Sequence, residues 1–527
     1  MLSFVAIAAI IGLGMLVWDC VEIGRNDAAN LVNAVFGARV LRRRVAVMIA
    51  GVAVVLGATF SSPVMETARK GIFDPTVLTV GMAISIYISV YFVDTVLLYT
   101  FSGFGMPVST TACLLFSMVG GSLFLAGPGN VQWPKVGEVA VGIILSIIIS
   151  GIMSFMVMRV FRGAIRDKAQ DRETLLLHGP WVAGALLTWL AWFMVFKGLK
   201  NVGFVKAIRA ETFQAYGEWL VLLLMWSGFT LATYIAIAVS NQERMKYLFH
   251  ATAILGMICM AFAFGQNDLA NAASPGLASL TLWRNSSSAS DLANVATAVA
   301  IPMWALFVCG LLIASGMFTN YAQRVTRAEV NTGSQFESVS LYAPNWCRAI
   351  ARVFVRMRGS HGPLAPALGF NERGKKVHYD TLRASVITSV SAGVIAFASG
   401  RGLPVSTTYV AFAAVLGTGL ADRVFVRGEA DKKMGRAIWV VTCWFLSPLI
   451  AMAATGILAT LVYRFAVAGL AMCFAINLTA RWYFRRRADA HESKYHPQAS
   501  KRKSALDEED DESPALDEVD EPAAATH

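Results

Sequence analysis

The amino-acid sequence predicts an all-α polytopic membrane protein with about twelve or thirteen membrane segments. Of its 527 residues, 56% are apolar and 15% are charged, whereas soluble domains are about 45–50% apolar and about 25% charged. Stretches such as VGEVAVGIILSIIISGIMSFMVMRV (136–160) also provide the ~20 apolar residues that cross a bilayer. The predicted segments centre near residues 12, 54, 89, 118, 149, 190, 229, 257, 306, 391, 415, 450 and 474.

The first segment runs directly into a polar motif and lacks a small-residue cleavage site, so we expect it to remain in the protein as a membrane helix. The net charge is +11, but the basic residues gather in short loops such as RVLRRR (39–44) and RWYFRRR (481–487). Basic loops at membrane boundaries follow the positive-inside rule, so no nucleic-acid partner is expected. Seven scattered cysteines without a CxxC pair indicate neither a disulfide framework nor a zinc site.

Two hydrophilic regions interrupt this pattern. Residues 488–527 are acidic and nearly free of aromatic residues, which predicts a disordered C-terminal tail. Residues from about 319 to 382 carry many Lys and Arg residues, which predicts a cytoplasmic basic loop with a short amphipathic helix near 346–357.

Two motifs occur twice, in the same order. GRNDAAN (24–30) matches GQNDLAN (265–271) at five of seven positions, and SGFGMPVSTT (102–111) matches SGRGLPVSTT (399–408) at eight of ten. A repeated pair of motifs indicates a duplicated architecture, a common feature of transporters. We therefore expect a first half over residues 1–247 and a second half over 248–487.

Loop charges predict that the second half is inverted relative to the first. The loop after the first NDxAN motif holds four arginines between 39 and 44, and the loop after the second holds only Arg284. The loop after the first PVSTT segment holds only Lys135, and the corresponding later loop holds five basic residues between 423 and 436. This alternation is typical of an inverted-topology repeat, and it places the N-terminus outside and the C-terminus in the cytoplasm.

The NDxAN motifs place a carboxylate inside the membrane, where an ionised group needs a partner, a proton or a metal ion. Asp27 and Asp268 are each followed three residues later by an asparagine, Asn30 or Asn271, on the same helix face. A carboxylate with amide and broken-helix carbonyl oxygens suits Na⁺ or a proton. The alternative is an interhelical hydrogen-bond clasp, and duplication favours the ion site.

The PVSTT segments predict an anion site. Pro107 and Pro404 follow glycines, which indicates a helix break before residues 109–111 and 406–408. The first turn of a new helix offers free backbone N–H groups and a positive dipole end, and hydroxyls add further donors. Ordinary capping of a membrane helix is the alternative. Facing acidic groups favour phosphate over sulfate, because a protonated phosphate can donate to a carboxylate.

These paired motifs resemble the inorganic phosphate transporter (PiT) family of secondary transporters, and ETARKGIFDP (66–75) adds to the likeness. The resemblance covers about residues 20–480. It implies two helical hairpins, broken helices and phosphate import by Na⁺ or H⁺ symport, with alternating access around a midplane site. Carried over, the substrate-binding residues are Asn26, Asp27, Ser109, Thr110, Thr111, Asn267, Asp268, Ser406, Thr407 and Thr408, and the coupling-ion residues are Asp27, Asn30, Asp268 and Asn271.

The chain departs from the family pattern at three places. Ala112 and Tyr409 stand where many relatives have His, so a proton relay through His is not expected there. Arg25 stands where a small residue is usual; it could hold the anion, pair with Asp27 or Glu22, or extend to the membrane surface. Weaker candidates are Asp19, Glu22 and Asp94 beside the site and Glu66, Arg69 and Lys70 as a gate or as interfacial ion pairs.

The expected molecule is an integral protein of a bacterial or archaeal cytoplasmic membrane, in contact with lipid. Its expected partners are inorganic phosphate and a coupling cation, Na⁺ or H⁺; a Na⁺ ion at Asp27 and Asp268 is one form of the coupling site. No other cofactor and no enzymatic activity are expected, because neither repeated motif carries a Cys or His nucleophile. Symport of sulfate or another oxyanion is the main alternative, followed by a passive anion channel. Homodimerisation is left open.

Overall fold

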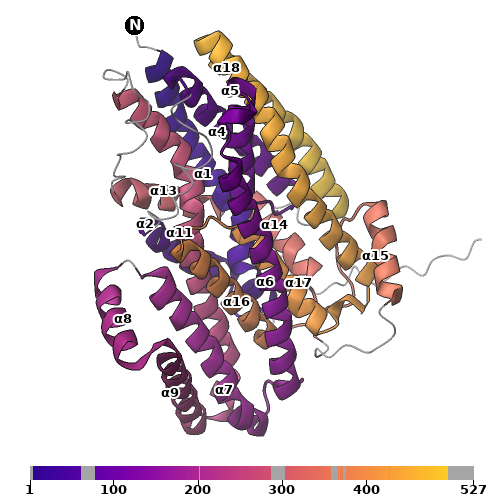
Figure 1. Cartoon of the computed structure of the whole chain (residues 1–527). Helices are drawn as coiled ribbons and strands as arrows, with labels where there is room; N and C mark the ends of the chain where they lie inside the picture. Colours follow the sequence, from indigo (N-terminus) through magenta and orange to yellow (C-terminus); the bar gives the residue numbers. More distant parts are fainter. Residues whose placement is uncertain are drawn as a thin grey trace, which may run out of the picture.

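The computed structural model shows a bundle of long helices (Figure 1) and describes residues 4–60, 78–200, 202–285, 303–357, 366, 368–371, 375–426 and 428–496. Within these ranges every named element is helical, and Phe370 and Lys376 form an isolated antiparallel β-bridge. The predicted all-α membrane fold is confirmed.

The first-half elements are α1 (Phe4–Gly37), α2 (Arg43–Thr59), α4 (Val80–Gly103), α5 (Thr110–Ala126) and α6 (Trp133–Ile165). The linking elements are α7 (Arg172–Ala191), a π-helical turn (Trp192–Gly198), α8 (Gly203–Tyr216), α9 (Glu218–Val239) and α10 (Gln242–Met245). The second-half elements are α11 (Leu248–Asn285), α13 (Met303–Gly316), α14 (Asn320–Thr332), α15 (Asn345–Met357), α16 (Thr381–Gly400), α17 (Thr407–Ala421) and α18 (Ala430–Tyr495).

All thirteen predicted segment centres lie in these helices. The number of described helices that are long enough to span the membrane is smaller than thirteen. Among the described residues, eight helices are long and apolar enough to span it, or nine if the bent pair α13–α14 is one span. α5 and α17 are shorter, at 17 and 15 residues, and about 1.5 Å per residue leaves both below the ~30 Å hydrocarbon thickness. α18 contains two predicted segments, joined at Ala466, where φ is 49°.

Each half contains a helical hairpin, as expected. α4 and α5 are joined by residues 104–109, and α16 and α17 by residues 401–406, with both connections non-helical. α5 packs on α18 of the other half, and α17 packs on α6. The hairpins are therefore held between the two halves rather than within one of them.

Close glycine contacts are exchanged between the halves. A Cβ atom on Gly24 in α1 would lie 1.8 Å from the carbonyl oxygen of Ile313 in α13. A Cβ atom on Gly265, the matching position in α11, would lie 2.3 Å from the carbonyl oxygen of Val54 in α2. The reciprocal close contacts join Gly57 to Phe262 and Gly316 to Val21. Such an exchange fits a two-fold relation between the halves; their inversion across the membrane stays a prediction.

The predicted basic loop begins with a helix instead. α14 packs on α1, and Glu329 and Val330 near its C-terminal end are buried. α13 and α14 meet at a 68° bend, so residues that look hydrophilic in sequence fold back against the bundle with their apolar side inward. α15 confirms the predicted amphipathic helix near 346–357.

Helical structure extends past residue 488, where the tail was predicted to begin. α18 continues to Tyr495, because Asp489 and Glu492 form ion pairs with Arg324 and Arg327 of α14. Residues 497–527 lie outside the described part of the chain.

Candidate functional site

The two NDxAN motifs lie within continuous helices. α1 and α11 remain helical across residues 24–30 and 265–271, so the expected helix breaks at these motifs, and the broken-helix carbonyl ligands, were wrong. The breaks lie in the hairpin connections, where Pro107 and Pro404 precede α5 and α17. An unbroken helix satisfies its own carbonyl groups, which leaves side chains as the available ligands at the motifs.

The first asparagine of each motif holds the hairpin connection of its own half. The side-chain oxygen Oδ1 of Asn26 accepts from the Val108 backbone N–H at 3.1 Å, and its side-chain amide donates to the Met106 carbonyl oxygen at 3.2 Å. The side-chain oxygen Oδ1 of Asn267 accepts from the Val405 backbone N–H at 3.2 Å, and its side-chain amide donates to the Val405 carbonyl oxygen at 2.7 Å. Each asparagine thus replaces hydrogen bonds that the broken helix lacks.

The Asp–Asn pair of the first half holds a threonine of the second. Thr408 donates to Asp27 Oδ1 at 2.7 Å and accepts from the Asn30 amide at 3.0 Å. Its hydroxyl also lies 3.2 Å from the carbonyl oxygen of Val108 in the first hairpin connection. One hydroxyl therefore joins α1, α17 and the connection between α4 and α5.

The second half reproduces this arrangement with two threonines. Thr111 accepts from the Asn271 amide at 2.7 Å and donates to the Val405 carbonyl oxygen at 2.9 Å. Thr110 donates to Asp268 Oδ1 at 2.9 Å.

The structure brings all twelve predicted site residues to this crossing of the two halves, and each is at most 3% exposed. They are Asn26, Asp27, Asn30, Ser109, Thr110, Thr111, Asn267, Asp268, Asn271, Ser406, Thr407 and Thr408. The predicted hydrogen-bond clasp is present, so the question is whether acceptors remain for an ion.

Four buried oxygen atoms of the site accept no hydrogen bond from the described residues. They are Oδ2 of Asp27 and Asp268 and Oδ1 of Asn30 and Asn271, one carboxylate and one amide oxygen from each half. Buried acceptors are almost always satisfied in native structures. Carboxylate and amide oxygens are the ligands expected for a hard cation, and a carboxylate oxygen can also take a proton.

The two serines cap their own helices. Ser109 accepts from the Ala112 N–H at 3.0 Å and Ser406 from the Tyr409 N–H at 3.2 Å. Capping therefore accounts for these hydroxyls, as the alternative reading of PVSTT expected. The earlier N–H groups of each first turn have no carbonyl four residues behind them in the helix and keep their donor capacity.

Comparison with known proteins follows from these motifs. Residues 23–332, more than half of the chain, match the model of the family described as "Phosphate transporter family". The chain belongs to the phosphate transporter family. The resemblance inferred from the repeated motifs is confirmed.

Relatives of this phosphate transporter span most of its length. It is 26% identical to a "Putative phosphate permease" of Pyrococcus horikoshii over 88% of this chain and 97% of that protein. It is 28% identical to a protein of the same description from Thermococcus kodakarensis, over 84% and 93%. A solved structure, "The sodium-dependent phosphate transporter", covers 88% of this chain and 99% of its own, with a TM-score of 0.63 and 21% identity, and supports the fold.

Arg25, whose role the sequence left open, pairs with Glu22 in this phosphate transporter. The guanidinium contacts both Glu22 carboxylate oxygens, at 2.8 and 2.7 Å. Arg481 of α18 donates to the same carboxylate at 2.6 Å. Glu22 is fully buried, and two arginines compensate its charge, so Arg25 is placed in an ion-pair network rather than on Asp27.

Asp19 of α1 and Asp94 of α4 are both buried, and these two helices pack against each other. The helix-pairing role of Asp94 stays a prediction. Tyr409, which replaces the family His, donates to the Trp444 carbonyl oxygen at 2.9 Å and stacks on its ring. Glu66, Arg69 and Lys70 lie outside the described residues.

Sequence reasoning missed one buried acid near the site. The Asn33 amide donates to Glu329 Oε2 at 2.9 Å, and both residues are 1% exposed. Asn33 is one helical turn beyond Asn30, which was a usable signal. Glu329 carried none, because its segment was predicted to be a loop.

Proposed function

We propose that the protein imports inorganic phosphate across the cytoplasmic membrane by symport with Na⁺ or H⁺. Membership of the phosphate transporter family supports the substrate. The observation that carries the mechanism is the crossed arrangement, in which the Asp–Asn pair of each half binds hydroxyl groups on the hairpin of the other.

The coupling cation binds at the buried oxygen atoms that accept no hydrogen bond within the interhelical clasp. Asp27 and Asn30 contribute one set and Asp268 and Asn271 the other. Ionised carboxylates at this depth are costly without a partner, so cation binding and stability of the closed site are linked. Na⁺ would be coordinated by these oxygens, whereas H⁺ would neutralise a carboxylate.

Phosphate binds beside these groups at the first turns of α5 and α17. The two helix N-termini present backbone N–H donors and positive dipole ends to an anion. A phosphate that retains a proton can donate it to Asp27 or Asp268, which fully ionised sulfate cannot do. The cation offsets the remaining repulsion between the anion and the two carboxylates, and this couples the two substrates.

Alternating access follows from how the hairpins are held. Each connection is bound by an asparagine of its own half and by polar groups of the other. Movement of one half against the other exchanges these contacts at one tip while the opposite tip stays closed. Rocking of repeats around a central site is the usual scheme for transporters of this architecture.

The test is uptake of radiolabelled phosphate into proteoliposomes under an inward Na⁺ gradient, an inward proton gradient or neither. Accumulation driven by one gradient and unaffected by excess sulfate supports phosphate symport and identifies the ion. Sulfate accumulation in the same vesicles would transfer the proposal to sulfate. Phosphate equilibration that ignores both gradients would contradict symport and indicate a channel.

A further inference from the structure

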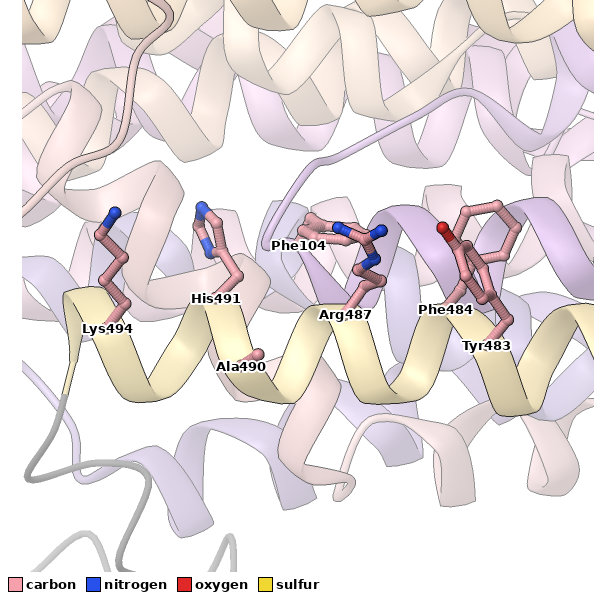
Figure 2. Close-up of a pocket in the computed structure, with 7 residues that line it drawn as sticks. All are labelled: Phe104, Tyr483, Phe484, Arg487, Ala490, His491 and Lys494. Carbon is pink, nitrogen blue, oxygen red and sulfur yellow. The ribbon is translucent and has the colours of Figure 1, made fainter.

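A pocket of about 560 Å³ lies between the C-terminal end of α18 and the tip of the first hairpin. Figure 2 shows Arg487, His491 and Lys494 along one side of α18, with Phe104 of the hairpin connection beside them. Tyr483, Phe484 and Ala490 complete the lining. The volume is in the range of small-ligand sites, roughly 300–1,000 Å³.

The positive charges around this pocket exceed the negative ones. Arg487 and Lys494 form no ion pair within the described residues. Arg324 and Arg327 are compensated by Asp489 and Glu492. Among the described residues, the pocket thus keeps two cations at its rim without an ion-paired carboxylate.

A third uncompensated cation lies deeper, in a smaller adjoining cavity that shares Phe104 and His491 with the pocket. Arg436 is 3% exposed and donates only to carbonyl oxygens, at 2.6 Å to Gly105 and 3.2 Å to Tyr342. Its Nε atom has no hydrogen-bond partner among the described residues. Glu492 also lines this cavity, but its carboxylate is paired with Arg327. A buried guanidinium that has no ion-pair partner among the described residues favours an anion nearby.

His496 adds no charge to the smaller cavity. It lines the smaller cavity just beyond the end of α18. Burial, followed by the charge of Arg327 and other nearby basic groups, lowers the pKa of His496 to about 3. The imidazole is therefore neutral at physiological pH, and the arginines remain the source of charge.

We propose that this pocket is a second anion site, which binds a phosphate group between Arg487 and Lys494 beside the tip of the first hairpin. Arg436, in the adjoining cavity, donates to the Gly105 carbonyl oxygen, and Asn26 donates to the Met106 carbonyl oxygen of the same connection. An occupant that draws on Arg436 therefore acts on the same connection that the transport site uses. The phosphate group belongs either to free inorganic phosphate or to the headgroup of an anionic lipid.

The test compares two variants of the full-length protein. The double variant Arg487→Gln/Lys494→Gln removes the rim charges of exposed residues, so the fold is retained. Arg486→Gln is the matched control, because Arg486 is on the same helix but stacks on Trp482 and does not line the pocket. Equal melting temperatures in detergent establish that both variants are folded.

Two binding measurements distinguish the sources. In nanodiscs of phosphatidylcholine alone, equilibrium binding of radiolabelled inorganic phosphate tests the free anion. In detergent, the amount of phosphatidylglycerol retained through purification tests the lipid. We expect the double variant to weaken one of these by at least about tenfold relative to Arg486→Gln, since charge-assisted contacts contribute about that much each.

Loss of one class of phosphate sites supports free phosphate, and loss of retained phosphatidylglycerol supports the lipid. Equal values for the double variant and the control in both measurements would overturn the proposal. Neither readout requires transport, so failure of gradient-driven uptake would contradict symport without touching this site.

Discussion

At the scale of single residues, the site depends on amide and hydroxyl groups that each form hydrogen bonds with two other site residues. Asn30 donates to both Asp27 and Thr408, and Thr408 in turn donates to Asp27. Hydrogen bonds to an ionised group are roughly twice as strong as those between neutral groups. Loss of one hydroxyl therefore disturbs both the carboxylate and the opposite hairpin.

We predict that Thr408→Val and Thr110→Val each raise the KM for phosphate. Each removes a donor to a buried carboxylate, and such bonds contribute about 1.5–3 kcal/mol, roughly 10- to 100-fold. Initial uptake rates against phosphate concentration provide the measurement. Thr442→Val is the control, because Thr442 bonds only to its own helix, at Ile438. An unchanged KM in both site variants would remove these hydroxyls from the binding mechanism.

The sequence predicted these residues because a polar motif within apolar segments needs partners, and two copies made coincidence a poor explanation. It could not predict which partners they have. The Asn267–Val405 bonds stay within one half, whereas Asp27–Thr408 crosses between halves. That difference depends on how the helices pack, which motif spacing does not encode.

At the scale of elements, the position of the site depends on close helix packing. The glycine before each NDxAN motif, Gly24 or Gly265, lies against a carbonyl oxygen of a helix in the other half, in α13 or α2. These contacts fix α1 and α11 two residues before Asn26 and Asn267. The sequence did not reveal this role, because it does not show which helices pack against these glycines.

We predict that Gly24→Ala destabilises the protein, because its Cβ atom would lie 1.8 Å from the Ile313 carbonyl oxygen. Overpacking of this kind costs about 1–3 kcal/mol or more. Gly14→Ala on the same helix is the control, since no atom lies within 4 Å of its added Cβ. Melting temperatures in detergent compare the two. Equal melting temperatures would contradict the prediction, because they would show that α13 can shift away from the added methyl group without loss of stability.

A second element-scale prediction concerns the ion pairs at the C-terminal end of α6. Arg162 binds Asp422 at 2.8 Å and also pairs with Asp380, with all three groups at most 10% exposed. Arg162→Met leaves two buried carboxylates unpaired, and loss of a buried partner costs about 3–5 kcal/mol. Lys135→Met, which breaks an exposed pair with Glu138, should cost less than about 1 kcal/mol. Similar losses of thermal stability would contradict the assignment.

The helices themselves were largely predictable because long apolar runs have few alternatives in a membrane. An exception is α14, whose polar residues led to the prediction of a loop. Its buried face includes Ala322, Val325 and Val330, with Glu329 bonded to Asn33. Only the folded bundle supplies the partner that makes such a segment a packed helix.

At the scale of the whole molecule, the two halves exchange both glycine and hydrogen-bond contacts around one site. The described helices therefore fit a two-fold arrangement. Loop charges predict that the axis lies in the membrane plane, with the N-terminus outside.

We predict that a fluorescent protein fused after the last residue, His527, is fluorescent in cells, and that a periplasmic alkaline phosphatase at the same point is inactive. The basic residues of 481–487 favour a cytoplasmic position for this end. A fusion of alkaline phosphatase before Met1 should be active. The reverse pattern would invert the charge-based topology and with it the predicted direction of import.

The central claim is that the carboxylates left over by the crossed clasps couple phosphate to a cation. The most direct measurement is phosphate accumulation in proteoliposomes under the driving gradient, for Asp27→Asn and Asp268→Asn beside Asp167→Asn, an exposed control. We predict that each site variant loses gradient-driven accumulation while the control retains it. Undiminished accumulation with both site carboxylates replaced would contradict the account.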